Sequence, residues 1–366
     1  MPLLTAEDTA AAIVAAAVWA PSVHNTQPWW FAANGPELSL YADCGRQLPV
    51  ADPTGREMLM SCGAALFTAR LTARSLGWIP RTALLPDPAD PLLVARVSWA
   101  ERAAPAGFET RLFGQVQQRR THRGGFDPVP LAPQLLTALQ AGAARDHAEL
   151  RVIPGEASQA WLAATIQAAD QATRLDSRRA SEQAAWTSPP GSPRPDGVPT
   201  SSYPAHPTRT VPDFPSRDFA RGRGWGLPPA STDATAHSAG VVCLLTTADD
   251  RPADWVNAGQ ALQRILLTSA AVGVAAALHS DPLEIGWTRH LIRSHTADSS
   301  YPQLIIRLGS VIQTAISVRR GPASVLAARA AATPGRAHAS PPAAAPGPAG
   351  SPDGHCSPAA RRTHCR

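Results

Sequence analysis

Apolar residues recur at helical spacing in several parts of the chain and define its predicted helices. Residues 9–19 form an Ala-rich helical run that ends before Pro21, because a proline disfavours a helical conformation at the residue before it. Residues 52–76 form a longer run, with Gly77 where a helix C-cap is expected. Its face is marked by Met58, Cys62, Ala65, Leu66 and Ala69.

Shorter segments with a strand pattern stand between these helices. Residues 27–31 are typical of the entry to a strand, residues 37–41 alternate between polar and apolar positions, and residues 92–97 are a second strand. Another helix is predicted after Pro130, with Leu135, Leu136 and Leu139 on one face.

The long helix and the strand after it occur a second time. Residues 254–272 form another small-residue helix, and residues 304–309 resemble the strand at 93–98. The helices match at a constant offset of 196, through the pairs Gly63 and Gly259, Ala65 and Ala261, Leu66 and Leu262, Leu71 and Leu267, Thr72 and Thr268, and Gly77 and Gly273. This offset predicts two tandem copies, since solenoid units repeat every ~20–50 residues. Chance similarity of two Ala-rich helices is the alternative.

Two segments depart from this layout. Residues 188–229 are rich in Pro, Gly, Ser and Arg, as a linker would be, but the region is also rich in aromatic residues: Trp186, Tyr203, Phe214, Phe219 and Trp225. Disordered linkers are poor in aromatic residues, so we expect an ordered flap that packs its rings over a bound planar group. From Gly321 onward the chain consists of Ala, Pro and Gly repeats and is predicted to be disordered.

Length and charge limit the functions that need considering. A chain of 366 residues, 44% of them hydrophobic, is long enough for about two domains of ~150 residues. The net charge is +5, but residues 321–366 hold five arginines and one acid, which leaves the body near neutral. This distribution of charge implies no general basic face, so we expect no nucleic-acid partner.

The chain contains no lysine; all 33 basic residues are arginine. This excludes a Walker A phosphate loop and a pyridoxal-phosphate Schiff base, both of which need a lysine. An anionic ligand must instead be held by arginine or by backbone amides, and the planar guanidinium suits phosphate.

The cysteines and apolar runs point to a reducing cytoplasm. Five cysteines are scattered without a Cys-x-x-Cys pair, so neither a zinc ribbon nor a thioredoxin-like site is expected, and no metal is predicted. The N-terminus lacks the early positive charge of a secretory signal. The longest apolar run, residues 265–278, is too short to span a bilayer, so no membrane partner is expected.

Two motifs carry the candidate chemistry. Residues 20–29, Ala-Pro-Ser-Val-His-Asn-Thr-Gln-Pro-Trp, offer hydroxyl and amide groups in a loop. Residues 119–126, Arg-Arg-Thr-His-Arg-Gly-Gly-Phe, concentrate positive charge. A phosphorylated, polyhydroxylated ligand needs both kinds of partner, since arginine binds phosphate and Ser or Asn side chains bind hydroxyls. The simpler interpretations are a turn after a helix and a solvated charge run.

Both motifs resemble those of the FMN-dependent nitroreductase family. The first is similar to that family's Ala-Pro-Ser-x-x-Asn-x-Gln-Pro-Trp loop, and the second to its Arg-Arg-Ser-x-Arg-x-Phe flavin-binding segment. The double-length form resembles the Acg-like branch, in which two nitroreductase folds are fused. The resemblance covers residues 1–320 and implies an α+β, nitroreductase-like fold whose two tandem copies form an intrachain pseudo-dimer.

The resemblance also implies how the site is assembled. In ordinary members FMN lies at a dimer interface, with the arginine segment from one subunit and the Pro-Ser loop from the other. Here copy one has the loop without a preceding arginine pair, and copy two has the arginine segment without the loop, where residues 148–150 stand instead. We therefore expect one FMN per chain, at the junction of the copies, and a monomer in solution.

The family's roles can be carried over by position. Arg119 and Thr121 would face the phosphate and ribityl chain, and Arg123 the pyrimidine edge of the flavin. The remaining implied contacts are Pro21, Ser22, Val23 and Asn25 from the loop, Glu284 and Gly286 near the flavin N5, and Arg319 and Arg320 near the phosphate. His24 and His122 stand at positions that vary in the family, so no catalytic residue is assigned.

These inferences give a domain layout and a function. We expect copy one at residues 1–110, copy two at 111–320 with a lid-like insertion at 188–229, and a tail at 321–366. The implied function is NAD(P)H-dependent reduction of nitroaromatics or quinones, both small-molecule substrates. Two alternatives stay open: an FMN-binding or storage protein whose lid blocks turnover, and a flavin-free scaffold.

Overall fold

The computed structural model describes residues 4–206, 209–228, 237–296, 299–311 and 317–327. The chain divides into a compact unit, Met1–Pro334, and a second unit, Gly335–Arg366, which lies outside the described residues. The helices are α1 (Ala6–Ala17), α2 (Arg56–Ser75), α3 (Gly107–Gly114), α4 (Pro133–Ala144), α5 (Glu156–Leu175), α6 (Ser177–Ala185), α7 (Pro252–Ala270), α8 (Asp281–Glu284) and α9 (Gly286–Thr296). Short 3-10 turns are η1 (Val23–Asn25), η2 (Cys44–Arg46), η3 (Thr200–Ser202) and η4 (Pro322–Ser324).

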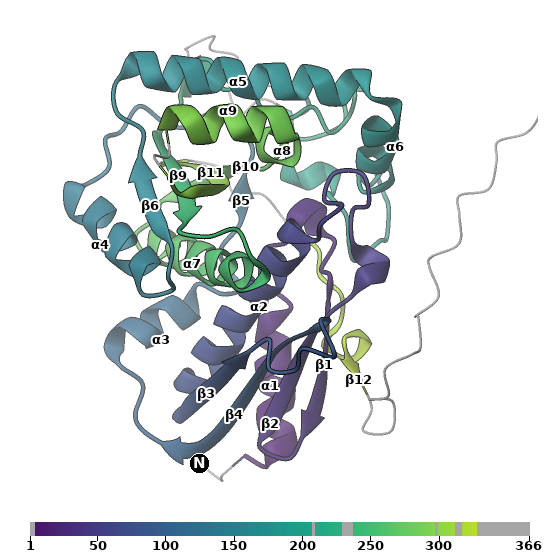
Figure 1. Ribbon diagram of the computed structural model, residues 1–366, viewed down its shortest axis with the longest axis vertical. Helices are drawn as coiled ribbons and strands as arrows, with labels where there is room; N and C mark the ends of the chain where they lie inside the picture. The colour runs from purple at the N-terminus through teal and green to yellow at the C-terminus, as the bar shows by residue number, and fades with distance from the viewer. Residues whose placement is uncertain (1–3, 207–208, 229–236, 297–298, 312–316, 328–366) are drawn as a thin grey trace, which may run out of the picture. The chain divides into compact units, whose positions relative to one another are not determined.

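The described strands form two five-stranded sheets and a short pair. The first sheet has the order β12-β1-β2-β4-β3, and the second β5-β10-β11-β9-β6. Their strands are β1 (Trp29–Asn34), β2 (Glu37–Ala42), β3 (Trp78–Leu84), β4 (Leu93–Arg102), β5 (Thr121–His122), β6 (Glu149–Val152), β9 (Val241–Thr247), β10 (Ala275–His279), β11 (Tyr301–Gly309) and β12 (Leu326–Ala327). The pair is β7 (Thr210–Val211) with β8 (His237–Ser238). Figure 1 shows α2 and α7 between the two sheets.

The two sheets share a common plan. The order α1-β1-β2-α2-β3-β4 along the chain recurs as α4-β6-β9-α7-β10-β11, with α5, α6, η3, β7 and β8 inserted after β6 and with α8 and α9 inserted after β10. Within the sheets, β1-β2-β4-β3 corresponds to β6-β9-β11-β10, and all these pairs are antiparallel. Each sheet then gains one parallel strand at a different edge, β12 beside β1 and β5 beside β10. We call the two sets half one and half two.

Helices α2 and α7 cross at their matched glycines. A Cβ on Gly63 would lie 2.1 Å from the Val256 carbonyl oxygen, and one on Gly259 would lie 1.9 Å from the Met60 oxygen. Both positions therefore require glycine, since no side chain fits against the facing backbone. Val256 of α7 packs in the core of half one, and Met60 of α2 packs in the core of half two. Each helix therefore places a side chain in the core of the other half.

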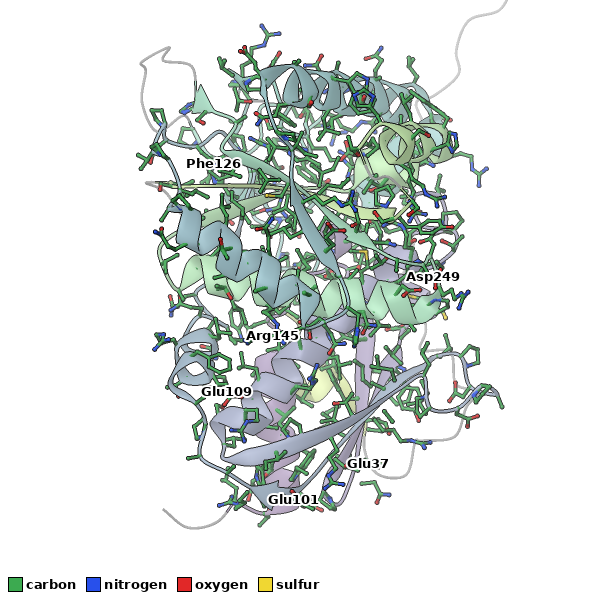
Figure 2. The ribbon with its side chains drawn as sticks, turned by 60° about the vertical axis from the view of Figure 1, so that its left-hand side comes forward. Glu37, Glu101, Glu109, Phe126, Arg145 and Asp249 are labelled. Carbon is green, nitrogen blue, oxygen red and sulfur yellow. The ribbon has the colours of Figure 1, made fainter. Side chains whose placement is uncertain are left out.

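The sheets differ in what covers them. In half one, β2 alternates buried and half-buried residues, which is typical of an antiparallel sheet with one packed face. In half two, β9 and β11 are buried almost throughout, because a further core of α5, α9 and Phe214 covers the second face. Charged side chains such as Glu101, Arg145 and Asp249 lie exposed on the outside (Figure 2).

The predicted elements are present, with shifted ends. Helix α1 begins before residue 9 because Thr5 and Asp8 form a reciprocal capping box. Helix α2 begins after residue 52, since Gly55 is left-handed and the Asp52 carboxylate accepts a hydrogen bond from the Met58 N–H. The pattern analysis did not identify β3, β6, β9 or β10.

The boundary expected at residue 321 is wrong. Residues 322–327 form η4 and β12, and the Phe31 N–H donates to the Val325 oxygen. Val325 is 1% exposed and packs in the core of half one, so this stretch is held by burial and by strand pairing. The rest of the predicted tail lies outside the described residues.

No helix in the described ranges is long and apolar enough to cross a membrane. The same ranges hold no cluster of three or more His, Cys, Asp or Glu side chains arranged to bind a metal ion. Cys44, Cys62 and Cys243 are free thiols.

Candidate functional site

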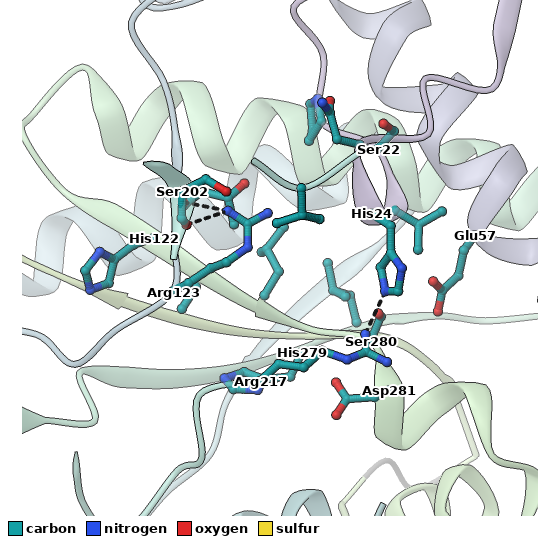
Figure 3. Close-up of a pocket in the computed structure, with 18 of the residues that line it drawn as sticks. Ser22, His24, Glu57, His122, Arg123, Ser202, Arg217, His279, Ser280 and Asp281 are labelled. Carbon is teal, nitrogen blue, oxygen red and sulfur yellow. Dashed lines mark hydrogen bonds between the residues drawn. The ribbon is translucent and has the colours of Figure 1, made fainter. Parts of the chain in front are cut away.

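A large cavity lies where the two predicted motifs meet. The space free of protein atoms is about 1320 Å³, counting the part open to solvent. Its walls come from the loop after α1, from α2, from the arginine segment, from the end of β10 and from flap residues within 198–202 and 215–219 (Figure 3).

The loop after α1 is held in a strained conformation. His24, Asn25 and Gln27 all have positive φ angles, of 44°, 56° and 50°. Such backbone persists only where its surroundings fix it, and it is concentrated at functional sites. Here the Ser22 hydroxyl accepts from the Gln27 N–H at 2.9 Å, and the Val23 N–H donates to the Ser61 hydroxyl of α2 at 3.2 Å.

Asn25 joins three distant segments at the cavity. Its amide nitrogen donates to the Gly197 oxygen of the flap at 2.9 Å and to the Val318 oxygen at 3.2 Å. Its amide oxygen accepts from Arg319 at 3.1 Å. The residue is 8% exposed, so its position is fixed by these contacts.

Buried arginines without acidic partners form one part of the cavity wall. Arg119 is 4% exposed, and its contact with another side chain is the Thr121 hydroxyl, at 3.3 Å. The Nε atoms of Arg119 and Arg319 are buried without a hydrogen-bond partner, and neither side chain pairs with a carboxylate among the described residues. Burial and the neighbouring arginines lower the pKa of Arg119 to about 10 and that of Arg319 to about 9. An anion bound here would restore the balance of charge.

Arg123 lies beside the flap. It donates to the Ser202 oxygen at 3.0 Å, and its guanidinium carbon is 5.4 Å from the centre of the Phe219 ring. Burial, and then the charge of Arg217, lower the pKa of Arg123 to about 10. Figure 3 shows the bond to Ser202 on one side of the cavity, opposite His24 and Glu57.

The flap covers the cavity, but most of its aromatic rings do not face it. Phe219 lines the cavity, whereas Tyr203 and Trp225 pack with it in a small core of the flap. Phe214 packs in the second-face core of half two, and Trp186 lies beside Arg46 and Arg194. The expectation that all five rings cover a planar ligand is therefore wrong, because most are used to hold the flap itself.

A second cluster of polar side chains in the cavity wall, around Arg217, was not predicted from the sequence. Arg217 of the flap donates to His24 Nε2 at 2.8 Å and lies 3.8 Å from the Glu284 carboxylate. Glu57 and Asp281 line the same cavity, and burial raises the pKa of both. Burial would lower the pKa of Arg217, but Asp281, Glu284 and other nearby acids raise it above its usual value.

The structure brings most of the predicted contacts together. Pro21, Ser22, Val23, Asn25, Arg119, Thr121, Arg123 and Arg319 all line the cavity.

Three predicted residues do not line it. Arg320 is turned to Gln27, with its backbone N–H 2.8 Å from the side-chain oxygen. Gly286 is exposed at the start of α9, and the Glu284 carboxylate accepts from the hydroxyl of Ser280, which itself lines the cavity. Residues 277–281 take their place, because β10 leads the chain past the cavity before α8 begins. Recognising β10 in the sequence would have located this segment.

Sequence comparison finds relatives along most of the chain. No protein-family model matches it. A Mycobacterium tuberculosis protein named "Putative NAD(P)H nitroreductase Rv3131" is 33% identical over 305 residues, covering 82% of this chain and 85% of that protein. "Putative NAD(P)H nitroreductase acg" of the same organism is 28% identical over 297 residues, covering 79% and 85%.

Solved structures show weaker similarity. A structure titled as a putative nitroreductase from Anabaena variabilis covers 82% of this chain and 87% of its own, with 10% identity and a TM-score of 0.45. A nitroreductase with bound FMN from Desulfitobacterium hafniense covers 57% and 92%, with 14% identity and a TM-score of 0.35.

Proposed function

The chain belongs to the nitroreductase family, and we propose that it binds one FMN in the cavity and reduces small nitroaromatic or quinone acceptors with NAD(P)H. The family membership rests on relatives named as NAD(P)H nitroreductases that match most of the chain. The location of the site rests on the cavity at which both sequence motifs meet.

The observation that carries the proposal is the charge of Arg119, which is buried, and of Arg319, which is half-buried, since neither pairs with a carboxylate among the described residues. Their free Nε–H groups and lowered pKa values fit a phosphate, which would supply both acceptor oxygens and negative charge. Thr121 has its hydroxyl 3.3 Å from Arg119, and Ser22 and Asn25 line the same cavity, so hydroxyl and amide groups of the kind that a ribityl chain binds are present. The donor set of the cavity therefore fits FMN.

FMN bound there would supply hydride transfer between NAD(P)H and the acceptor. Arg123 would place a cation near the ring, where it stabilises the negative charge of the reduced form. The flap residues Pro199, Ser202 and Phe219 would exclude water from the same space.

We further propose that the two halves are tandem copies forming an intrachain pseudo-dimer. The repeated element order and the reciprocal contacts of Gly63 and Gly259 support this, because a two-fold interface pairs residue i with j and j with i. Half one would be residues 1–110, half two 111–320 with the insertion at 188–229, and the chain would be a monomer with one FMN.

The number of FMN molecules bound per chain tests both the FMN site and the single site at the junction of the halves. Purified protein saturated with FMN should show about one flavin per chain by its absorbance near 450 nm, and the colour should bleach with NADPH in the absence of oxygen. Protein that takes up no flavin would refute the FMN site, and two flavins per chain would refute the single junction site.

A second candidate, an FMN-binding or storage protein without turnover, is favoured by the anchoring of the flap. Gln27 and Asn25 donate to the flap oxygens of Pro195 and Gly197, and Arg46 forms an ion pair with Asp196. Replacing residues 189–224 by a short Gly/Ser linker should accelerate NADPH oxidation if the flap gates the enzyme. Fast reduction of a nitroaromatic by the full chain would exclude storage.

A further inference from the structure

Two buried polar atoms, on residues that line the cavity, have no partner among the described residues. They are His24 Nδ1 and Glu57 Oε2, on side chains that are 8% and 5% exposed. Both residues line the cavity, and Figure 3 shows the Glu57 carboxyl turned toward the His24 ring. Buried polar groups left unpaired in a binding cavity require a ligand or water to satisfy them.

The bond from Arg217 determines which atom of His24 carries its proton. A guanidinium has donors and no acceptor, so His24 Nε2 must accept the 2.8 Å bond. Burial, followed by the charges of Arg217 and Arg123, lowers the pKa of His24 and keeps the ring neutral. The proton therefore lies on Nδ1, and the free atom is a hydrogen-bond donor.

Glu57 presents a donor as well. Its Oε1 accepts from Arg56 Nη2 at 2.9 Å, while Oε2 is free. Burial, followed by the charge of Glu284, raises the pKa of Glu57 and favours the protonated carboxyl, although the ion pair with Arg56 acts in the opposite direction. Since Oε1 is occupied as an acceptor, Oε2 is the oxygen that offers its O–H.

The backbone holds these two donors in register. The Val23 N–H donates to the Ser61 hydroxyl, which in turn donates to the Glu57 carbonyl oxygen at 2.7 Å. The residue before His24 is thereby fixed to the helical turn that carries Glu57. Two donors held in this way match a ligand with acceptor oxygens. Such a ligand accepts both hydrogen bonds without itself being protonated.

We propose that His24 Nδ1–H and the Glu57 carboxyl bind the oxygens of a neutral acceptor group on the substrate, a nitro group or a quinone carbonyl. This inference rests on the proposed function, because it names the substrate-binding residues of the same site. Neither residue has a role in the FMN contacts proposed above, which are made by arginine, hydroxyl and amide groups.

Calorimetric titration with nitrobenzene and toluene tests the proposal, because the two ligands differ in a nitro and a methyl group. His24→Phe keeps a ring but removes the donor, so affinity for nitrobenzene should fall about 3- to 10-fold while that for toluene stays within about 2-fold. Glu57→Leu should act in the same way, whereas Glu57→Gln keeps a donor and should restore the affinity. His295→Phe, on α9 against Trp161, is the matched control and should change neither.

Flavin content, measured in each variant, separates this proposal from the proposed function. Equal losses for nitrobenzene and toluene would overturn the subsite, and so would a loss of FMN affinity without a change in the nitrobenzene-to-toluene ratio. A protein without FMN would refute the proposed function, while the calorimetric ratio would still test the two donors.

Discussion

The two halves use the same layout and differ in the short segment after their first helix. After α1 the chain forms the strained loop whose residues 21–25 line the cavity. After α4 the corresponding segment is closed, because Asp146 is buried and paired with Arg264 of α7 at 2.7 and 3.1 Å. The same topology therefore supports an open site in one place and a structural ion pair in the other.

The halves also differ in what was added to them. Half one gains β12 from the C-terminal segment, which brings Arg319 to the cavity. Half two gains β5 and the covering layer of α5 and α9, and its flap closes over the loop of half one. Each addition completes a site whose other wall belongs to the other half, so neither half contains the whole cavity.

The largest expected effect on stability is at the crossing of α2 and α7, where the two halves meet. Gly259→Ala places a Cβ 1.9 Å from the Met60 backbone oxygen, so we expect a loss of about 3 kcal/mol in the free energy of unfolding. Gly63→Ala should cost a similar amount if the crossing is symmetrical. Urea unfolding measures the free energy of unfolding of both variants.

Gly142→Ala on α4 is the control for these changes, because its Cβ would meet only the flexible side chain of Arg264. It should be tolerated within about 1 kcal/mol. A tolerated Gly259→Ala, or a large difference between the two crossing glycines, would contradict the reciprocal packing.

Removing an arginine should affect FMN affinity differently at the open cavity and at the closed segment after α4. Arg119→Ala removes a charged partner of the phosphate, worth about 1.5–3 kcal/mol, so FMN affinity should fall roughly 10- to 150-fold. Arg145→Ala removes an exposed arginine from the closed segment and should leave the affinity within about 2-fold. Fluorescence titration of flavin gives both values, and equal losses would show that the effect is one of net charge.

Arg123 should behave differently from Arg119. Arg123→Ala should lower the flavin reduction potential more than it weakens binding, because the side chain is assigned to the ring and not to the phosphate. Potentiometric titration measures this. A change in binding with an unaltered potential would contradict that role.

The added strand of half one gives a smaller prediction. Truncation before Gly321 removes β12 and the buried side chain of Val325, which should cost about 2 kcal/mol in the free energy of unfolding. Truncation after Ala327 retains both and serves as the control. Equal stability of the two shortened chains, measured by urea unfolding, would show that β12 contributes nothing.

The smallest effect concerns two acids that precede the crossing helices. Burial would raise the pKa of Asp250, but hydrogen bonds from Arg289, Trp255 and other neighbours lower it to about 2. Burial raises the pKa of Asp52, ahead of α2, to about 6. The two acids should therefore change stability in opposite directions with pH.

Because the folded pKa of Asp250 lies below its unfolded value, its stabilisation is present above about pH 4 and is lost as the pH falls toward 2. Allowing for solvent screening, Asp250→Asn should cost about 1 kcal/mol at pH 7 and less at pH 3. The folded pKa of Asp52 lies above its unfolded value, so its ionisation should reduce stability as the pH rises from about 4 to 6. Unfolding curves at pH 3, 5 and 7 test both, and parallel pH profiles would contradict the assignment.

Much of the site could be predicted from the sequence, because its motifs are local. The loop at residues 20–29 and the segment at 119–126 are contiguous, and eight of the eleven predicted contacts line the cavity. The helices at 9–19, 52–76 and 254–272 were predictable for the same reason, since helical periodicity and capping depend on neighbours within one or two turns.

Contacts between distant residues were decided by the tertiary structure alone. Arg217 meets His24 across 193 positions, and Asn25 meets Arg319 across 294. Neither Glu57 nor Asp281 belongs to a motif, and their positions in the cavity follow from where α2 begins and β10 ends in space. Local spacing carries no information about such pairs, because packing brings them together and burial then sets their charge.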